Sequence, residues 1–279
     1  MAAEPPIGPA TQPLEEDGAV LEYMELPSGM ATYHMPALPE PEETAGLDAA
    51  LAKLDEILAA LRAYRPAAAP TEIDLGSLDA GNRAFIDQAL GEGEVSIVAG
   101  DRLQAQESVL AGVWRVHHVA DDGALVRDLV EVGDFPAAVN RVAFDTGRPF
   151  VRRPDGSLPP GLLAAPSLIA EIRNALIDFA PGRLHAINLS LLPHSEDDLA
   201  FLGGHLGPGA VTILSRGYGN SRISSTGTRN VWWVQYFNSQ DALILNSLEV
   251  SETPEVAKAS PEDIADSAGR LTEILEVYR

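Results

Sequence analysis

The chain has 279 residues, no cysteine, 41 acidic against 19 basic residues and a formal net charge of −22. The lack of cysteine excludes disulfides, a thiol nucleophile and any zinc or iron–sulfur site held by thiolates, and a field of this sign repels nucleic acid and anionic lipid surfaces. No segment is long and apolar enough for a spanning helix, and the first residues lack the basic and apolar regions of a secretory signal, so we expect a cytoplasmic protein without membrane insertion.

The first part of the chain is predicted to form an arm followed by one helix. Residues 1–43 are rich in proline, glutamate and alanine, which disfavours helices and central strands, so we expect an extended or disordered, proline-rich acidic arm. Residues 44–65 carry leucines at alternating spacings of four and three, typical of a helix with one narrow apolar stripe: Leu47, Leu51, Leu54, Leu58 and Leu61. This stripe could pack on the chain's own body or pair two copies into a homodimer. A proline-rich linker follows at residues 66–70.

The remainder of the chain contains an internal repeat. The segment at Ile73 matches the one at Ile187, with an offset of 187 − 73 = 114, and the segment at Val113 matches the one at Val231, with an offset of 231 − 113 = 118. The matching order and nearly constant offset predict two copies of one structural unit, residues 71–183 and 184–279. We expect the helical segment 165–176 to close the first copy and its match, 260–271, to close the second.

Each copy is predicted to contain the same elements in the same order. A helix over residues 79–90 or 195–206 ends at Gly91 or Gly207, because glycine readily adopts the left-handed conformation found at helix C-termini. Three strands follow, and the last two form an antiparallel hairpin: 95–98, 113–119 and 125–132 in the first copy, and 211–214, 231–237 and 243–250 in the second. The predicted fold class is therefore α+β: two tandem repeats, each a small antiparallel sheet with helices packed on one face, preceded by the proline-rich arm and the amphipathic helix.

The strand period of two separates the side chains of each hairpin into two faces. Bulky residues at equivalent positions in both copies are assigned to the helix-covered cores: Trp114, Val116, His118, Val126, Val130 and Val132, and Trp232, Val234, Tyr236, Ile244, Leu248 and Val250. The opposite face differs between the copies: Arg115, His117, Leu125 and Arg127 in the first, and Trp233, Gln235, Phe237, Leu243 and Leu245 in the second. If exposed, the second set would form a partner-binding surface. The alternative is that it packs against the N-terminal helix or between the copies.

Residues 215–226, with the sequence SRGYGNSRISST, combine glycines with arginines. We favour a surface loop that recognises a peptide or carboxylate over a catalytic loop, and its candidate residues are Arg216, Gly217, Tyr218, Gly219, Asn220 and Arg222. A twisted strand with a glycine-assisted bend is the alternative. No serine-hydrolase, zinc-protease or paired-carboxylate motif occurs. We therefore expect a binding protein rather than an enzyme, with no metal and no cofactor.

The run SRGYGNSRISSTGTRNVWWVQYFNSQDALILNSLEV, followed by PEVAKASPEDIADSAGRLTEIL, resembles the hydrogenase expression/formation proteins of the HupH/HyaF/HoxQ type, closely over residues 187–279 and more loosely over 73–180. The resemblance implies an accessory chaperone of nickel–iron hydrogenase maturation that binds the small-subunit precursor before export, with a thioredoxin-like companion chaperone. The basic signal segment of such a precursor would suit a partner with a net charge of −22. The alternative is a metal- or ligand-dependent maturation enzyme acting through the 215–226 loop. Ser221 stands where the family is expected to carry a cysteine, and this favours binding over metal transfer.

Overall fold

The computed structural model describes residues 46–145, 147–154, 158–216 and 220–279, and the predicted arm over residues 1–43 lies outside this part of the chain. The helices are α1 (Asp48–Ala63), α2 (Ala80–Leu90), α3 (Ala137–Asp145), α4 (Ala165–Ile177), α5 (Glu196–Leu206) and α6 (Pro261–Val277), with short 3-10 helices η2 (Leu189–Leu191) and η3 (Glu255–Ala257). The strands are β1 (Thr71–Asp74), β2 (Val95–Ala99), β3 (Leu103–Glu107), β4 (Val113–Val119), β5 (Leu125–Val132), β6 (His185–Asn188), β7 (Pro208–Ser215), β8 (Asn220–Thr226), β9 (Val231–Phe237) and β10 (Leu243–Val250).

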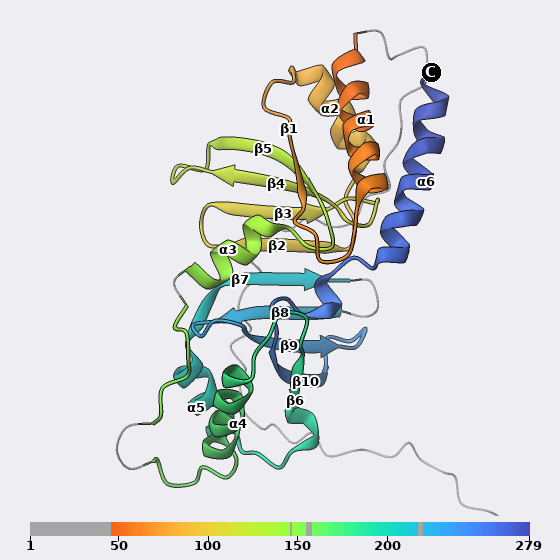
Figure 1. The fold of residues 1–279 in the computed structure, drawn as a ribbon. Helices are drawn as coiled ribbons and strands as arrows, with labels where there is room; N and C mark the ends of the chain where they lie inside the picture. The colour runs from red at the N-terminus through yellow and green to blue at the C-terminus, as the bar shows by residue number, and fades with distance from the viewer. Residues whose placement is uncertain (1–45, 146, 155–157, 217–219) are drawn as a thin grey trace, which may run out of the picture.

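These strands form one antiparallel sheet in the order β1-β5-β4-β3-β2-β7-β8-β9-β10-β6 (Figure 1). The order reads symmetrically outward from the central β2–β7 pair, so the sheet has the pseudo-twofold symmetry that a duplication produces. The α+β class is confirmed, but the prediction of two separate small sheets is wrong. β2 and β7 pair along their length, from Val95 with Ser215 to Ala99 with Val211, and this pairing removes the two strand edges that separate sheets would expose.

Two central strands, β3 and β8, have no counterpart in the prediction. β8 consists mainly of serine, threonine and asparagine with Ile223 as its one large aliphatic residue, so it lacks the bulky alternation that marks a strand. As a result, the predicted glycine–arginine loop is a strand over residues 220–226, and only residues 216–219 connect β7 to β8. The alternative of a strand with a bend is therefore closer to the structure than the surface loop.

A bulge interrupts the outer hairpin at the same place in both halves. The pairing register shifts by one residue beside Val126 in the β4–β5 hairpin and beside Ile244 in the β9–β10 hairpin. One extra residue breaks the alternation of faces, and the assignment of Val126 and Ile244 to the cores is therefore wrong: they are 64% and 61% exposed. His118 and Tyr236 are partly buried. The other predicted core residues are buried: Trp114, Val116, Val130, Val132, Trp232, Val234, Leu248 and Val250.

Helices cover both faces of the sheet, whereas the prediction places them on one. α3 and η3 lie on one face, where strands of both halves form a single core around Trp114 and Trp232. On the other face, α1, α2 and α6 pack over the β1 end of the sheet, and α4 and α5 pack over the β6 end (Figure 1). Adjacent residues such as Val113 and Trp114 are both fully buried because each faces a different core.

Helix α4 is the structural equivalent of α1. Asn82 on α2 accepts a hydrogen bond at its Oδ1 from the backbone N–H of Ala50 in α1 (2.8 Å), and Asp198 on α5 accepts one from the backbone N–H of Ala165 in α4 (2.8 Å). The predicted pairing of segment 165–176 with 260–271 is therefore wrong, since α4 packs on α5 and α6 packs on α1. The predicted boundary at residue 183 separates α4 from the half on which it packs, because the strand repeat alone does not reveal where a helix docks.

The leucine stripe of α1 lies inside the chain. Leu54, Leu58 and Leu61 are buried in the core that α1 shares with α2 and α6, and Leu47 and Leu51 pack against this core. The alternative in which the stripe packs on its own body is confirmed, and this surface is not free to pair two copies. A homodimer through another surface stays a prediction. No helix in the described ranges is long and apolar enough to cross a membrane.

Candidate partner-binding face

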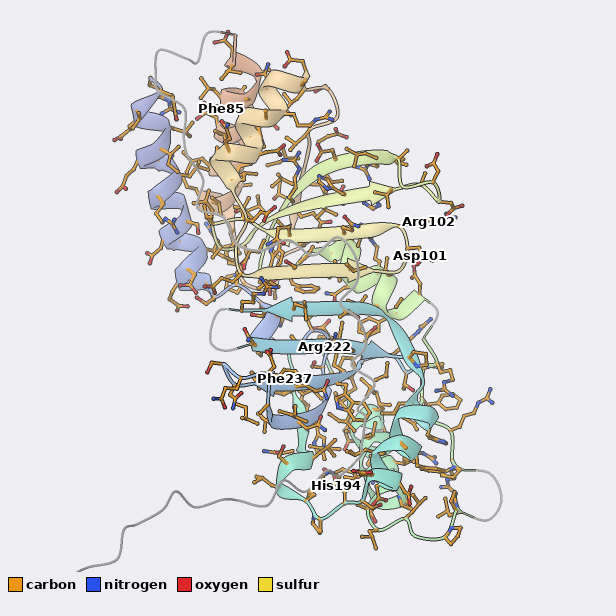
Figure 2. The ribbon with its side chains drawn as sticks, turned by 180° about the vertical axis from the view of Figure 1, so that it is seen from behind. Phe85, Asp101, Arg102, His194, Arg222 and Phe237 are labelled. Atoms are coloured by element: carbon orange, nitrogen blue, oxygen red, sulfur yellow. The ribbon has the colours of Figure 1, made fainter. Side chains whose placement is uncertain are left out.

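The middle of the sheet is open on the face opposite α3. Strands β3, β2, β7 and β8 lie between the α1/α2/α6 layer and the α4/α5 layer, and Figure 2 shows no described helix in front of them. Cross-strand registers place eight side chains side by side here: Ser96, Val98, Gln104, Gln106, Thr212, Leu214, Arg222 and Ser224. We call this surface the open face. It is a mainly polar strip between two helical layers.

At its first-half border the open face meets a charged cluster around Asp128. The buried Asp128 carboxylate accepts hydrogen bonds from Nε and Nη2 of Arg115 at 2.5 and 2.7 Å, and His117 Nε2 lies 3.2 Å away. Arg115 Nη1 lies 2.9 Å from Asp87 on α2, and Arg83 Nε lies 3.4 Å from Asp128. Burial alone would raise the pKa of Asp128, but the hydrogen bonds from His117 and Arg115 outweigh it and lower this pKa to about 2. The charges of this border are therefore satisfied within the chain.

The second half replaces every member of this cluster by an uncharged residue. The positions equivalent to Arg83, Asp87, Arg115, His117 and Asp128 are occupied by Leu199, Gly203, Trp233, Gln235 and Asn246. Trp233 Nε1 donates to Asn246 Oδ1 at 2.5 Å, in the place of the Arg115–Asp128 pair. Gly203 lies beside the indole, since a Cβ at this position would stand 3.9 Å from Trp233 Cζ3, an ordinary van der Waals distance.

Trp233 is therefore partly buried beneath α5 and packs against the α4/α5 core. Trp233 thus packs within the chain, but against α4 and α5 rather than against the N-terminal helix or between the copies, where the alternative places it. Its part in partner binding stays a prediction. Its neighbour Trp232 is fully buried on the other face, with its ring edge-on to Phe144 at 5.6 Å between centroids.

Five of the predicted residues form one continuous strip at the second-half border of the open face. The registers pair Arg222 with Gln235, Asn220 with Phe237, and Phe237 with Leu243. We call these five residues the Phe237 strip, and Figure 2 labels Arg222 and Phe237 within it. Leu243 is exposed, as is Asn220, and the other three are half-buried. The strip thus offers apolar, amide and guanidinium groups together.

Leu245 does not join the Phe237 strip. The bulge in β10 pairs it with Tyr236, which packs against the core on the α3 side of the sheet. Its assignment to the Trp233 face is therefore wrong, for the same reason that Ile244 is exposed. Gly217, Tyr218 and Gly219 lie outside the described residues, and their part in binding stays a prediction.

Arg216 is exposed at the end of β7, where its backbone N–H donates to the carbonyl of Glu94 at 3.1 Å. The neighbouring Ser215 lines a cavity of about 540 Å³ that reaches Glu107 and the N-terminal part of α6. Burial, together with the charges of Glu94 and Asp263, raises the pKa of Glu107 to about 7, although a hydrogen bond from the Gly112 N–H opposes this. No sequence motif marks Glu107, which lies on the unpredicted strand β3.

Ser221 occupies a buried position at the start of β8, 3% exposed, and its hydroxyl has no hydrogen-bond partner among the residues that the structure describes. A thiol satisfies such a site more easily, because it is a weaker donor and behaves as a small apolar group. In the described part of the chain, no group of three or more histidine, aspartate or glutamate side chains is arranged to hold a metal ion.

A family model described as the HupH hydrogenase expression protein, C-terminal conserved region, matches residues 47–148 and 162–278. The two stretches begin beside α1 and α4, in agreement with the equivalence of these helices. The hydrogenase expression/formation protein HupH of Rhodobacter capsulatus is 49% identical over 99% of this chain and 98% of its own, and HoxQ of Cupriavidus necator is 44% identical over 97% and 95%. The hydrogenase-1 operon protein HyaF of Escherichia coli is 34% identical over 97% and 94%. Among solved structures, a hydrogenase expression protein HupH from Thiobacillus denitrificans has 31% identity and a TM-score of 0.36, covering 39% of this chain and 90% of that one.

Proposed function

Because the chain belongs to the HupH family of hydrogenase expression proteins, we propose that it is an accessory chaperone of nickel–iron hydrogenase maturation that binds the small-subunit precursor before export. The names of the relatives, hydrogenase expression/formation proteins, support a role in hydrogenase maturation. The proposed binding surface is the Phe237 strip, at the second-half border of the open face.

The observation that carries this surface is the difference between the two halves. In the first half, Asp128 and Arg115 close the border of the open face with internal ion pairs. In the second half, the positions equivalent to this cluster carry uncharged side chains, and they continue into the partly exposed Phe237 strip. A partner that covers these positions does not have to remove the equivalent of the Asp128 ion pairs from water, so this surface costs less to bury than the first-half border.

The net charge of −22 adds a long-range attraction for a basic segment. We propose that the signal segment of the precursor is drawn to the protein in this way, in the cytoplasm, before export. A thioredoxin-like companion chaperone would act on the same client. In this proposal the protein binds and releases the precursor, and catalyses no step.

The competing hypothesis is a maturation enzyme acting through residues 215–226. Most of that segment is the strand β8 inside the sheet, with Ile223 in the central core. This leaves few residues for a catalytic loop, and the binding proposal is therefore preferred.

Co-purification tests the proposal directly. The tagged protein is isolated from cells that make the small-subunit precursor with or without its signal segment. We expect the precursor to be retained only when the signal segment is present. Failure to retain a signal-bearing precursor, with the tagged protein folded, would contradict the proposal.

The repeat provides matched controls for the surface. Val119 and Gln104 are the first-half equivalents of Phe237 and Arg222, at an offset of 118. We expect Phe237→Ala and Arg222→Ala to reduce retention of the precursor, and Val119→Ala and Gln104→Ala to leave it unchanged. Equal losses in both halves would place the binding surface elsewhere.

A further inference from the structure

The two outer edges of the sheet differ in how they discourage the addition of another strand. β1, at one edge, follows Pro70 and carries the acids Glu72 and Asp74. Arg127 Nη2 and Arg141 Nη2 each lie 3.7 Å from the carboxylate of Glu72. Charged side chains and proline are the usual means by which proteins prevent an exposed edge from pairing with another chain. The β1 edge is therefore protected.

The β6 edge lacks this protection. At the position equivalent to Glu72, with the offset 186 − 72 = 114, β6 has Ala186, and no lysine, arginine, aspartate or glutamate occurs within the strand. Leu184 directly before it is 48% exposed, and Leu191 shortly after it is 80% exposed. Among the described residues no strand pairs with its outer side. An edge strand without lysine, arginine, aspartate, glutamate or proline is a template for an added strand.

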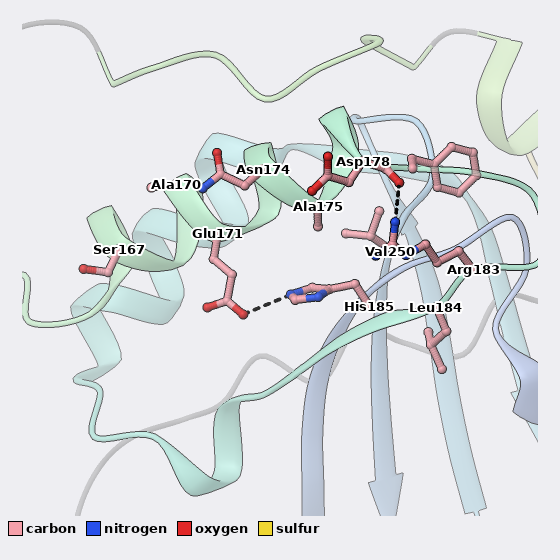
Figure 3. Close-up of a pocket in the computed structure, with 11 residues that line it drawn as sticks. Ser167, Ala170, Glu171, Asn174, Ala175, Asp178, Arg183, Leu184, His185 and Val250 are labelled. Atoms are coloured by element: carbon pink, nitrogen blue, oxygen red, sulfur yellow. Dashed lines mark hydrogen bonds and ion pairs between the residues drawn. The ribbon is translucent and has the colours of Figure 1, made fainter.

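A cleft lies beside this edge, between α4 and the start of β6 (Figure 3). Its volume is about 530 Å³. Apolar side chains line one part of it: Ala175, Phe179, Leu184 and Val250. Polar groups stand along the rest, where Glu171 Oε1 lies 2.9 Å from His185 Nε2 and Arg183 Nη1 donates to the carbonyl of Asp178 at 3.2 Å. A strand added to β6 would direct every second side chain towards this cleft, since side chains alternate across a sheet.

We propose that the outer edge of β6 accepts an extended, positively charged segment of the partner protein as an added strand, with alternate side chains in the α4–β6 cleft. Main-chain hydrogen bonds to β6 would hold the segment, and the cleft would select its side chains. This inference rests on the proposed function for its partner, the small-subunit precursor, but it names a surface separate from the Phe237 strip.

The charges around the cleft favour a basic segment over a second copy of the chain at the β6 edge. Around the cleft, Glu171, Asp178 and Glu252 stand against Arg183, and the Glu252 carboxylate accepts the N–H of Gly182 at 3.2 Å just before β6. A second copy of the chain would bring another net charge of −22 to the same edge, and repulsion opposes this pairing. A basic segment is attracted by both the local and the overall field.

Hydrogen exchange of the full chain, with and without the purified precursor, tests the inference. We expect the amides of residues 185–188 to exchange about tenfold more slowly or better in the complex, which corresponds to about 1.4 kcal/mol. Residues 71–74 at the opposite edge should be unaffected. A complex in which 185–188 exchange as in the free protein would overturn the inference and leave the proposed function intact. If no complex forms, both fail.

Matched variants address the edge itself. Ala186→Lys and Glu72→Gln each raise the net charge by one unit, at equivalent positions of the two edges. We expect Ala186→Lys to weaken precursor binding by about tenfold or more, and Glu72→Gln to leave it unchanged. Leu191→Lys changes a residue that is too exposed to disturb the core, and it should weaken binding as well. This second variant shows that a loss of binding in Ala186→Lys does not come from misfolding. Equal affinities of the wild type and these variants for the precursor would contradict the inference. It would also be contradicted if the free protein forms a dimer that the Ala186→Lys substitution dissociates, because a second copy would then occupy the edge.

Discussion

Replacing Glu107 by glutamine should stabilise the protein at pH 8 and have little effect at pH 5. The side chain is 9% exposed, and burial raises its pKa to about 7 from an ordinary value of 4.5. The folded protein therefore holds this proton more tightly than the unfolded chain does, and the free energy of unfolding falls as the pH rises from about 4.5 to 7. This rise of the pKa from 4.5 to about 7, at about 1.36 kcal/mol for each pH unit, amounts to a loss of about 3 kcal/mol above pH 7.

Glutamine carries no charge and keeps a carbonyl that can accept the Gly112 N–H, now at 3.3 Å from Glu107 Oε1. Urea unfolding of both proteins from pH 5 to 8 gives the difference directly. It should rise from about 1 kcal/mol or less at pH 5 to about 3 kcal/mol in favour of the glutamine protein at pH 8. Burial also raises the pKa values of Glu131 and Glu249. Both groups titrate in the wild type and in the glutamine protein, so their contributions cancel in the difference between the two proteins. A difference that is independent of pH would refute the reasoning.

Three further changes probe the fold. Trp232→Ala removes a fully buried indole packed on Phe144 and should lower the free energy of unfolding by about 3–5 kcal/mol in urea titrations; an unchanged midpoint would contradict its place in the central core. Asp128→Asn removes the carboxylate that pairs with Arg115 and His117, while Arg115 keeps its contact with Asp87. Because the pKa of Asp128 is lowered from 3.8 to about 2, the loss of about 2 kcal/mol expected at pH 7 should shrink as the pH falls from 4 towards 2. Asp198→Asn weakens the hydrogen bonds to the first turn of α4, so limited proteolysis should cut this helix faster, and an unaltered digestion pattern would argue against the cap.

The parts of the fold that local chemistry determines were accessible from the sequence. Two strands, 113–119 and 231–237, appear where predicted, and so do the glycines that end α2 and α5. Alternating bulky side chains and helix-ending glycines both act within a few residues of the chain. The joining of the two halves through β2 and β7 depends on hydrogen bonds between segments more than a hundred residues apart. No local pattern reveals such a pairing.

Helix docking was likewise hidden. The sequence of α4 is that of an amphipathic helix, and such a sequence does not say on which half of the sheet the helix packs. The equivalence of α4 with α1 follows from the hydrogen bonds that Asn82 and Asp198 accept from the first turns of these helices. The bulges beside Val126 and Ile244 were hidden as well. One extra residue in a strand moves the side chains beyond it to the opposite face of the sheet, and the amino-acid composition of the strand gives no sign of this.

The candidate site was predicted in part. Arg222, Gln235 and Phe237 do lie on one surface, since the period of two holds within β8 and β9. The partial burial of Trp233 depends on its packing against the core beneath α4 and α5, which lie far from it in the sequence. The Asp128 cluster depends on cross-strand contacts with Arg115 and His117. Such tertiary contacts decide which half of a duplicated surface remains open.

The most direct test of the account is the affinity of the purified small-subunit precursor for three forms of the protein: the wild type, Phe237→Ala and Val119→Ala. We expect Phe237→Ala to weaken binding by about tenfold or more, equivalent to about 1.4 kcal/mol, with its unfolding midpoint preserved, and Val119→Ala to bind as the wild type does. Wild-type affinity in the Phe237→Ala protein would contradict the central claim that the second half of the duplicated sheet holds the precursor.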